Sequence, residues 1–291
     1  MNKNVSLVLS GGGARGIAHI GVIEELEKQG FNIKSISGTS MGSLVGAVYA
    51  VGKMQEYKDW MYTLHKLEVF NLIDFTFSSQ GLIKGDRVFK KMKEFIPDLN
   101  IEELDIHYAA TAADIINNKE VVFTKGSIYD AVRASVAIPT VFTPVVTENS
   151  ILVDGGIMNN VPISHVKRTK NDILIVVYVN ADIPVIRPPI SKKEMDKKQS
   201  VYLKKMKEFY GHINKSKSKS KIEKLGYFDI IDRTISLVTY QLAQLLMEKS
   251  SPDILINVSR DSCGTFDFYK AEELVEIGRL AAIKSLEEYN N

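Results

Sequence analysis

The sequence predicts an α/β fold, a three-layer α/β/α domain with a mainly parallel central sheet. Two short apolar runs, residues 5–10 and 33–37, are each followed by a glycine-containing turn and then by a helical pattern. A third run, 173–180, is apolar up to its last residue, as expected for a strand buried on both faces of a parallel sheet. Strands that alternate with helices in this way are typical of a parallel sheet covered by helices.

Length and composition predict one globular domain. The chain has 291 residues, of which 45% are hydrophobic and 25% charged, and this is typical of a soluble protein with a substantial core. We expect the core at about 5–180, a basic insertion at about 182–224 and a C-terminal helix–strand–helix at about 229–291. The formal net charge of +2 gives the chain as a whole no attraction to nucleic acid.

The sequence predicts a cytoplasmic location. The single cysteine, Cys263, cannot form an intramolecular disulfide and fits a reducing compartment. No apolar run reaches the roughly 18 residues that a membrane-spanning helix needs. The apolar stretch near the N-terminus is too short for a signal peptide and leads directly into glycines, which favours a first strand.

The first strand is followed by a glycine loop, Gly11-Gly12-Gly13-Ala14-Arg15-Gly16, and by a helix predicted at 17–29. This order matches the dinucleotide-binding pattern Gly-x-Gly-x-x-Gly, which requires an acidic residue at the end of the second strand. The second strand instead ends in Ser-Gly-Thr-Ser, so we expect no nucleotide and no other cofactor. The alternative is that the loop amides point into one space and form an oxyanion hole, which needs a nucleophile nearby.

The second strand supplies that nucleophile in the motif Gly38-Thr-Ser40-Met-Gly42. A Gly-x-Ser-x-Gly motif between a strand and a helix, here 43–51, predicts a nucleophile elbow. Side chains at Gly38 and Gly42 would collide with the neighbouring strand and helix, and the helix directs its positive end at Ser40. The other interpretation is an ordinary glycine-rich turn. Two adjacent parallel strands would bring the glycine loop and Ser40 side by side.

A serine hydroxyl needs a base, and Asp154 is the candidate. It follows a strand predicted at 151–153, and the two glycines after it, Gly155 and Gly156, would let the carboxylate approach closely. The five histidines are His19, His65, His107, His165 and His212. Only the last two follow Asp154 in the chain, and neither lies in a motif, so a triad that uses His165 is the variant hypothesis.

The stretch 52–99 is predicted to be mostly helical, with one helix at 85–95. It is followed by strands predicted at 108–115 and 120–124 and by a helix at 128–135. Aromatic and apolar residues recur at helical spacing in this stretch and form a stripe that indicates core or the wall of a pocket. Its members are Tyr57, Trp60, Met61, Leu64 and Leu67. The irregular apolar segment 70–82 suits either an acyl-chain pocket or lid, or ordinary core.

Four blocks together resemble the patatin-like phospholipase family: residues 11–16, 38–42, the Ala-Ser-x-x-x-Pro block at 134–139, and Asp-Gly-Gly at 154–156. The resemblance covers about 5–180. It implies Ser40 as the nucleophile, Asp154 as its partner in a dyad without histidine, the amides of Gly11 to Gly13 as the oxyanion hole, and Arg15 as a brace for that loop. It further implies a phospholipase A or lysophospholipase without a metal.

Two alternatives stay open beside this function. One is a hydrolase of small esters or thioesters with the same dyad. The other is a lipid-binding regulator that has lost turnover. The sequence contains no cluster of metal-ligand residues and no internal repeat.

The segment 187–224 carries thirteen Lys/Arg against four Asp/Glu. It is either an interfacial helix on anionic lipid, which would place the protein at the inner membrane surface, or a solvated insertion. Nucleic-acid binding is not expected, because no aromatic-basic module accompanies the lysines. A long helix at 229–249 is predicted to lie in the core or in a homodimer, followed by a strand at 253–258 and an amphipathic helix at 270–289.

Overall fold

The structure is a computed structural model that describes residues 3–72, 74–78, 81–186 and 227–290. Its strands are β1 (Asn4–Leu9), β2 (Asn32–Thr39), β3 (Phe75–Ser78), β4 (Gly81–Ile83), β5 (His107–Asp114), β6 (Lys119–Phe123), β7 (Val145–Val146), β8 (Ile151–Asp154), β9 (Ile173–Ala181) and β10 (Ile254–Ser259). Its α-helices are α1 (Ala18–Lys28), α2 (Met41–Ala50), α3 (Met54–Thr63), α4 (Lys66–Leu72), α5 (Asp86–Met92), α6 (Ile128–Ser135), α8 (Tyr227–Ser250) and α9 (Ala271–Asn290). Most of the predicted basic insertion, from 187 to 224, lies outside the described residues.

The main sheet has the strand order β10-β9-β1-β2-β5-β8-β7, with β6 paired to β5. The five strands from β10 to β5 are parallel to one another, whereas β6, β7 and β8 run antiparallel to their neighbours. The predicted mainly parallel sheet is therefore confirmed, and the antiparallel strands lie together on one side of it. The carboxyl ends of the parallel strands all meet at one edge of the sheet.

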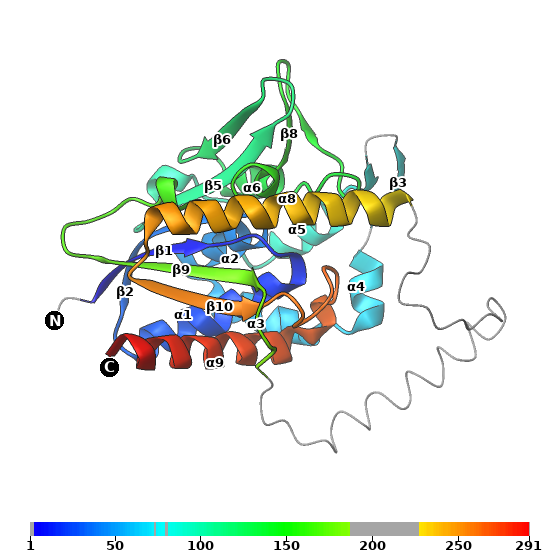
Figure 1. Ribbon diagram of the computed structural model, residues 1–291. Helices are drawn as coiled ribbons and strands as arrows, with labels where there is room; N and C mark the ends of the chain where they lie inside the picture. Colours follow the sequence, from blue (N-terminus) through cyan, green and yellow to red (C-terminus); the bar gives the residue numbers. More distant parts are fainter. Residues whose placement is uncertain (1–2, 73, 79–80, 187–226, 291) are drawn as a thin grey trace.

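Helices cover both faces of this sheet (Figure 1). Side chains alternate along each strand, so neighbours such as Leu7 and Val8 enter different layers. Leu7 belongs to the larger core, which α1, α2 and α9 cover. Val8 belongs to a smaller core beneath α8, with Ala243 and Met247 from that helix. Both faces of the sheet are thus buried by helices, and the predicted three-layer architecture is confirmed.

One local prediction changed in the structure. The apolar segment 70–82 contains the antiparallel pair β3–β4, where the sequence showed only irregular spacing. His165 ends a 3-10 helix of three residues, η4 (Ile163–His165). Within the described residues, no helix combines the length and the apolar character needed to cross a bilayer.

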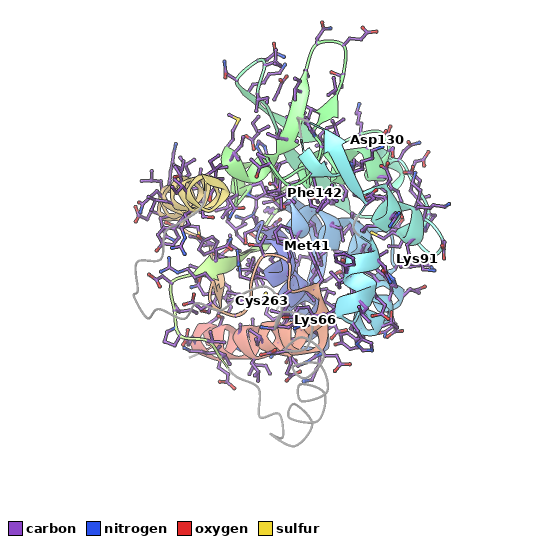
Figure 2. All side chains as sticks on the ribbon, turned by 90° about the vertical axis from the view of Figure 1, so that its right-hand side faces the viewer. Met41, Lys66, Lys91, Asp130, Phe142 and Cys263 are labelled. Carbon is purple, nitrogen blue, oxygen red and sulfur yellow. The ribbon has the colours of Figure 1, made fainter. Side chains whose placement is uncertain are left out.

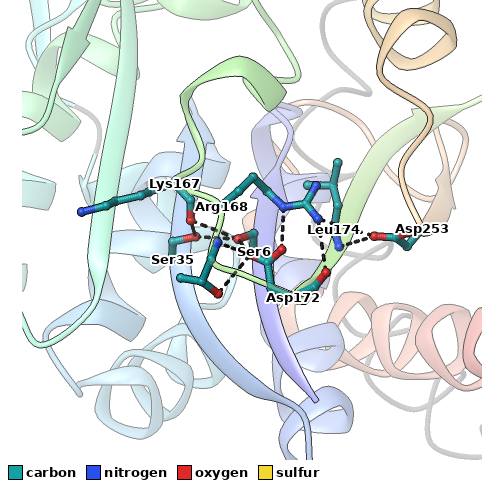
Figure 3. A network of polar contacts seen from close by, with 8 residues as sticks. Ser6, Ser35, Lys167, Arg168, Asp172, Leu174 and Asp253 are labelled. Atoms are coloured by element: carbon teal, nitrogen blue, oxygen red, sulfur yellow. Dashed lines mark hydrogen bonds and ion pairs between the residues drawn. The ribbon is translucent and has the colours of Figure 1, made fainter. Parts of the chain in front are cut away.

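The amino edge of the sheet is closed by a buried polar network (Figure 3). The Asp172 carboxylate, before β9, accepts hydrogen bonds from the Ser6 hydroxyl of β1, from Arg168 Nε at 2.7 Å and from the Thr169 amide at 2.7 Å. The Ser35 hydroxyl of β2 donates to the Lys167 carbonyl at 2.6 Å. These bonds join the loop before β9 to β1 and β2 at the edge opposite to the glycine loop.

Candidate active site

Ser40 lies in a tight turn between β2 and α2, as the motif predicts. Its backbone has φ 54° and ψ −126°, a region that residues other than glycine rarely adopt. A Cβ at Gly38 would lie 2.5 Å from the Gly42 carbonyl, and one at Gly42 would lie 2.2 Å from the Leu9 carbonyl oxygen of β1. Both glycines are therefore required by close backbone contacts on either side of the serine.

Ser135, the last residue of α6, holds the strained backbone of Ser40. The Ser40 N–H donates to Ser135 Oγ at 2.9 Å, and that hydroxyl donates to the Thr111 carbonyl of β5 at 2.7 Å. Ser135 is fully buried, so the hydroxyl satisfies two backbone groups that water does not reach. The sequence analysis assigned Ser135 no role. Its position in the Ala-Ser-x-x-x-Pro block was the one feature of the sequence that pointed to a role in the site.

Asp154 reaches Ser40 because β8 runs antiparallel to β5. Thr39 pairs with Thr111 of β5, and the next residue of β5, Ala112, pairs with Asp154. The Asp154 carboxylate accepts a hydrogen bond from the Gly156 N–H at 2.8 Å. The Ser40 side chain lies close enough to this carboxylate to lower its pKa. A Cβ at Gly155 would lie 2.4 Å from the Thr111 carbonyl oxygen, so this glycine lets β8 turn close against β5.

Burial raises the pKa of Asp154 to about 6, although the hydrogen bonds from Ser40 and Gly156 act in the opposite direction. A carboxylate in water has a pKa near 4 and is a weak base. Asp154 is therefore a stronger base than an ordinary aspartate, while it is still ionised at neutral pH. This combination suits a group that must take a proton from a hydroxyl.

The glycine loop packs against Ser40, but its amides are not equivalent. The Gly11 N–H donates to the Asn160 carbonyl at 3.1 Å, and the Ala14 N–H donates to the Thr265 carbonyl at 2.8 Å. The Gly11 amide therefore already has a protein acceptor, in contrast to our expectation that all three glycine amides face the oxyanion. Between these two anchored residues lie Gly12 and Gly13.

Arg15 ties this loop to two neighbouring segments. Its Nε donates to Asn180 Oδ1 at 3.0 Å, and its Nη1 donates to the Cys263 carbonyl at 3.2 Å. The Asn180 side chain in turn donates to the Gly11 carbonyl at 2.7 Å. Arg15 and Asn180 thus hold the loop against the end of β9. Sequence reasoning missed Asn180, which is the polar residue at the end of an otherwise apolar strand.

Ser40 opens into an apolar pocket with about 990 Å³ of empty space, open solvent at its mouth included. Gly13 and Ser40 form its polar end. The rest of the wall comes from α2–α5, from the loop after α6 and from the β10–α9 loop; its members include Tyr57, Trp60, Met61, Leu64, Leu72, Phe89, Ile138, Phe142 and Phe268. Four of the five residues of the predicted stripe line the pocket, and Leu67 faces solvent instead.

Two of the histidines, His165 and His19, have other contacts. His165 Nε2 lies 2.9 Å from the Glu120 carboxylate. His19 is fully buried, its ring contacts the Ser10 carbonyl at 2.9 Å, and burial lowers its pKa to about 4. His212 lies outside the described residues. Among the described residues, no three His, Cys, Asp or Glu side chains come together as metal ligands.

An α/β sheet that presents a serine elbow to an apolar pocket has the architecture of a lipid ester hydrolase. The family model described as patatin-like phospholipase matches residues 7–167, more than half of the chain. The chain therefore belongs to the patatin-like phospholipase family, and this membership supports lipid hydrolysis as its general activity.

Relatives extend the similarity beyond this region. An uncharacterised NTE family protein of Mycobacterium tuberculosis is 28% identical over 333 residues, which cover 99% of this chain and 92% of the relative. Lysophospholipase NTE1 of Kluyveromyces lactis is 28% identical over 283 residues, 94% of this chain but 18% of that protein. The crystal structure of VipD from Legionella pneumophila has a TM-score of 0.50 at 13% identity, covers 99% of this chain and 67% of that one, and shows a shared fold.

Proposed function

We propose that this protein is a lipid acyl hydrolase of the phospholipase A or lysophospholipase type, which cleaves carboxylic esters through a Ser40–Asp154 dyad. The observation that carries the proposal is that the Ser40 hydroxyl lies against a buried carboxylate, whose pKa it lowers, and also lines an apolar pocket. The name of the lysophospholipase relative supports the same substrate class.

In the first half-reaction, Asp154 accepts the proton of the Ser40 hydroxyl as its oxygen attacks the ester carbonyl. The tetrahedral oxyanion is bound by the N–H groups of Gly12 and Gly13, next to the N-terminus of α2. Asp154 then gives the proton to the leaving alcohol oxygen, the ester C–O bond breaks, and the acyl group stays on Ser40.

In the second half-reaction, water attacks the acyl-enzyme. Asp154 takes one proton from this water and returns it to Ser40 Oγ as the fatty acid leaves. No histidine takes part. The apolar wall of the pocket holds the acyl chain, since the burial of each CH₂ group contributes about 0.8 kcal/mol.

Two other functions are separated by the same experiment. A hydrolase of small esters or thioesters would not use the length of the pocket, and a lipid-binding regulator would not turn over. The apolar wall favours long chains over the first of these. The contact between Ser40 and Asp154 favours catalysis over the second.

The test is fluorophosphonate labelling and hydrolysis of p-nitrophenyl esters of short and long chains. We expect Ser40→Ala and Asp154→Ala each to lower kcat/KM by at least about 10³-fold and Ser40→Ala to abolish labelling. For wild type, kcat/KM should rise by up to about fourfold per added CH₂ until the pocket is filled. His165→Ala is the matched control and should retain activity.

The proposal fails if strong labelling survives in Ser40→Ala. A folded wild type that neither labels nor hydrolyses any ester supports the lipid-binding regulator instead. A flat chain-length profile supports the small-ester hydrolase.

A further inference from the structure

A second, smaller cavity lies next to the pocket that opens at Ser40, which is called the acyl pocket below. This second cavity has about 260 Å³ of empty space, any open solvent included. Aliphatic and aromatic side chains form its wall, and they come from α2, from α5 and the turn after it, and from α6. The reaction described above gives this cavity no role.

Three side chains line both cavities and therefore form a partition between them. They are Leu44 of α2 and Phe89 and Met92 of α5. Leu44 and Met92 are buried, and the Phe89 ring packs edge-on against the Tyr129 ring of α6, with ring centroids 6.0 Å apart. The Tyr129 hydroxyl donates to the Ile96 carbonyl at 3.1 Å, which holds this ring in place. The partition is thus one side chain thick and lies inside the protein.

Helix α2 leads from the nucleophile to both cavities. The Leu44 N–H donates to the Ser40 carbonyl at 3.1 Å, so Leu44 lies one helical turn beyond the nucleophile. The α2 residues that line the second cavity are Leu44, Ala47 and Val48, followed just past the helix by Val51. This spacing places the four on one face of the helix. An extended chain that starts at Ser40 and follows this face meets the partition first and the second cavity behind it.

Figure 2 shows where the two cavities lie in the molecule. Met41 and Phe142, which line the acyl pocket, lie near the centre of the view. Lys91 of α5 and Asp130 of α6 lie to the right of them, and each is the chain neighbour of a residue that lines the second cavity. The second cavity therefore continues from the acyl pocket toward α5 and α6.

From this arrangement we infer that the partition of Leu44, Phe89 and Met92 sets the longest acyl chain that the site accepts. The acyl chain runs from Ser40 along α2, ends against the partition and does not enter the second cavity. Met92 has an unbranched side chain of the kind that fills irregular gaps, and its removal joins the two cavities. This inference rests on the proposed function for its substrate, but the partition can be tested by binding alone.

The experiment compares two methionine variants. Met92→Ala opens the partition, and Met61→Ala is the matched control. Both methionines line the acyl pocket and both are buried, at 3% and 2% exposure, but of the two only Met92 also lines the second cavity. The two substitutions remove the same atoms from the wall of the acyl pocket, and only Met92→Ala gives the acyl chain a path beyond it.

The first readout is the binding of fatty acids in the Ser40→Ala background, in which no ester is turned over. Trp60 lines the acyl pocket and is the single tryptophan of the chain, so its fluorescence reports the entry of an acyl chain. Saturated fatty acids from octanoate to stearate are titrated. For the parent we expect the affinity to rise by up to about fourfold per added CH₂ and to stop rising at a limiting length.

Met92→Ala should move this limit to longer chains by at least about two carbons. The affinity ratio between the acid two carbons beyond the parent's limit and the acid at that limit should then rise at least about tenfold, because two more CH₂ groups become buried. Met61→Ala should leave the limiting length where it is. Ratios within one variant are compared, since both variants lose contacts with the bound chain.

A double variant should close the path again. Ala47 lines the second cavity but not the acyl pocket, so Ala47→Leu fills space behind the partition. Met92→Ala/Ala47→Leu should return the limit to that of the parent, and Ala47→Leu alone should keep it. Phe89→Ala opens the same partition at a less buried position, and it takes the place of Met92→Ala if thermal unfolding shows that this variant does not fold.

An equal shift of the limit in Met92→Ala and Met61→Ala would overturn the inference, because the width of the pocket would then set the length. A folded opening variant without any shift would overturn it too, and so would a shift that persists with Ala47→Leu. With Ser40 intact, the limits for hydrolysis of p-nitrophenyl esters should follow those for binding. If wild type hydrolyses no ester but the binding limit still moves with the partition, the proposed function fails and the role of the partition stands.

Discussion

At the scale of single residues, the strained backbone of Ser40 depends on a hydroxyl from a different element. Ser135 accepts the Ser40 N–H and donates to the Thr111 carbonyl, so its removal leaves two buried backbone groups without a partner. Ser259 makes the same kind of pair elsewhere: it accepts the Asp261 N–H at 3.2 Å and donates to the Ile183 carbonyl at 2.6 Å. The two serines form a matched pair for mutation.

We expect Ser135→Ala and Ser259→Ala to lower the free energy of unfolding by about 1–3 kcal/mol each. Only Ser135→Ala should lower kcat, because only this hydroxyl orients the nucleophile, and KM should change little. Urea denaturation and steady-state kinetics on one soluble ester measure both effects. A similar fall of kcat in both variants would show that lost stability, and not the position of Ser40, is responsible.

The raised pKa of Asp154 predicts how activity depends on pH. The carboxylate must be ionised to accept the serine proton, so kcat/KM should rise with pH through about 6 and level off above it. Rates measured with p-nitrophenyl butyrate from pH 4.5 to 8, together with thermal unfolding at each pH, would separate titration from acid unfolding. His165→Ala should keep the same acid limb; its disappearance in that variant would support a triad instead.

At the scale of elements, α1 and α9 touch through two glycines. A Cβ at Gly21 would lie 1.8 Å from the Val275 carbonyl oxygen of α9, and one at Gly278 would lie 1.9 Å from the Ala18 carbonyl oxygen of α1. The backbones of the two helices thus contact each other directly, and the pair covers one face of the sheet, with α1 against β2 and β9 and α9 against β10. A side chain at either position must push the two helices apart.

We expect Gly21→Ala and Gly278→Ala each to destabilise the protein by about 1–3 kcal/mol, although alanine favours a helix by about 1 kcal/mol. The double variant should cost less than the sum, because helices already separated by one Cβ have room for the second. Urea denaturation of the three variants tests this coupling. Strictly additive losses, or no loss, would contradict the close contact.

At the scale of the whole molecule, the two edges of the sheet have different roles. The carboxyl edge holds Ser40, Asp154 and the glycine loop, where glycines allow close backbone contacts around a strained serine. The amino edge holds the Asp172 network (Figure 3). Burial acts to raise the pKa of Asp172, but the hydrogen bonds from Ser6, Thr169 and Arg168 outweigh it, and the pKa lies below its usual value.

Folding lowers the pKa of Asp172, so the ionised carboxylate stabilises the folded protein at pH values above its usual pKa near 4. This stabilisation is lost as the pH falls through the lower pKa of the folded state. Asp172→Asn should therefore lower the free energy of unfolding by about 1–3 kcal/mol at pH 7, with a smaller difference near pH 3. Asp182→Asn, which removes an exposed ion pair to Arg260, should cost less than about 1 kcal/mol. Urea denaturation at both pH values is the measurement, and kcat at pH 7 should be unchanged in both variants.

Two expectations about assembly stay predictions. The helix predicted at 229–249 is α8, and its outer face exposes Ile230, Leu237, Val238 and Leu245, which leaves the homodimer open to test. The membrane contact predicted for 187–224 lies outside the described residues.

The sequence by itself determined most of the order of strands and helices, the elbow around Ser40, and the family whose motif contains Asp154. These depend on local physics: residue periodicity, the need for glycine beside a tight turn, and short motifs. Only the tertiary structure decided that β8 runs antiparallel and so returns Asp154 to Ser40, that Ser135 holds the Ser40 amide, and that the Gly11 amide is already bound. Strand direction and contacts between distant segments depend on how whole elements pack, and no short stretch of sequence contains that information.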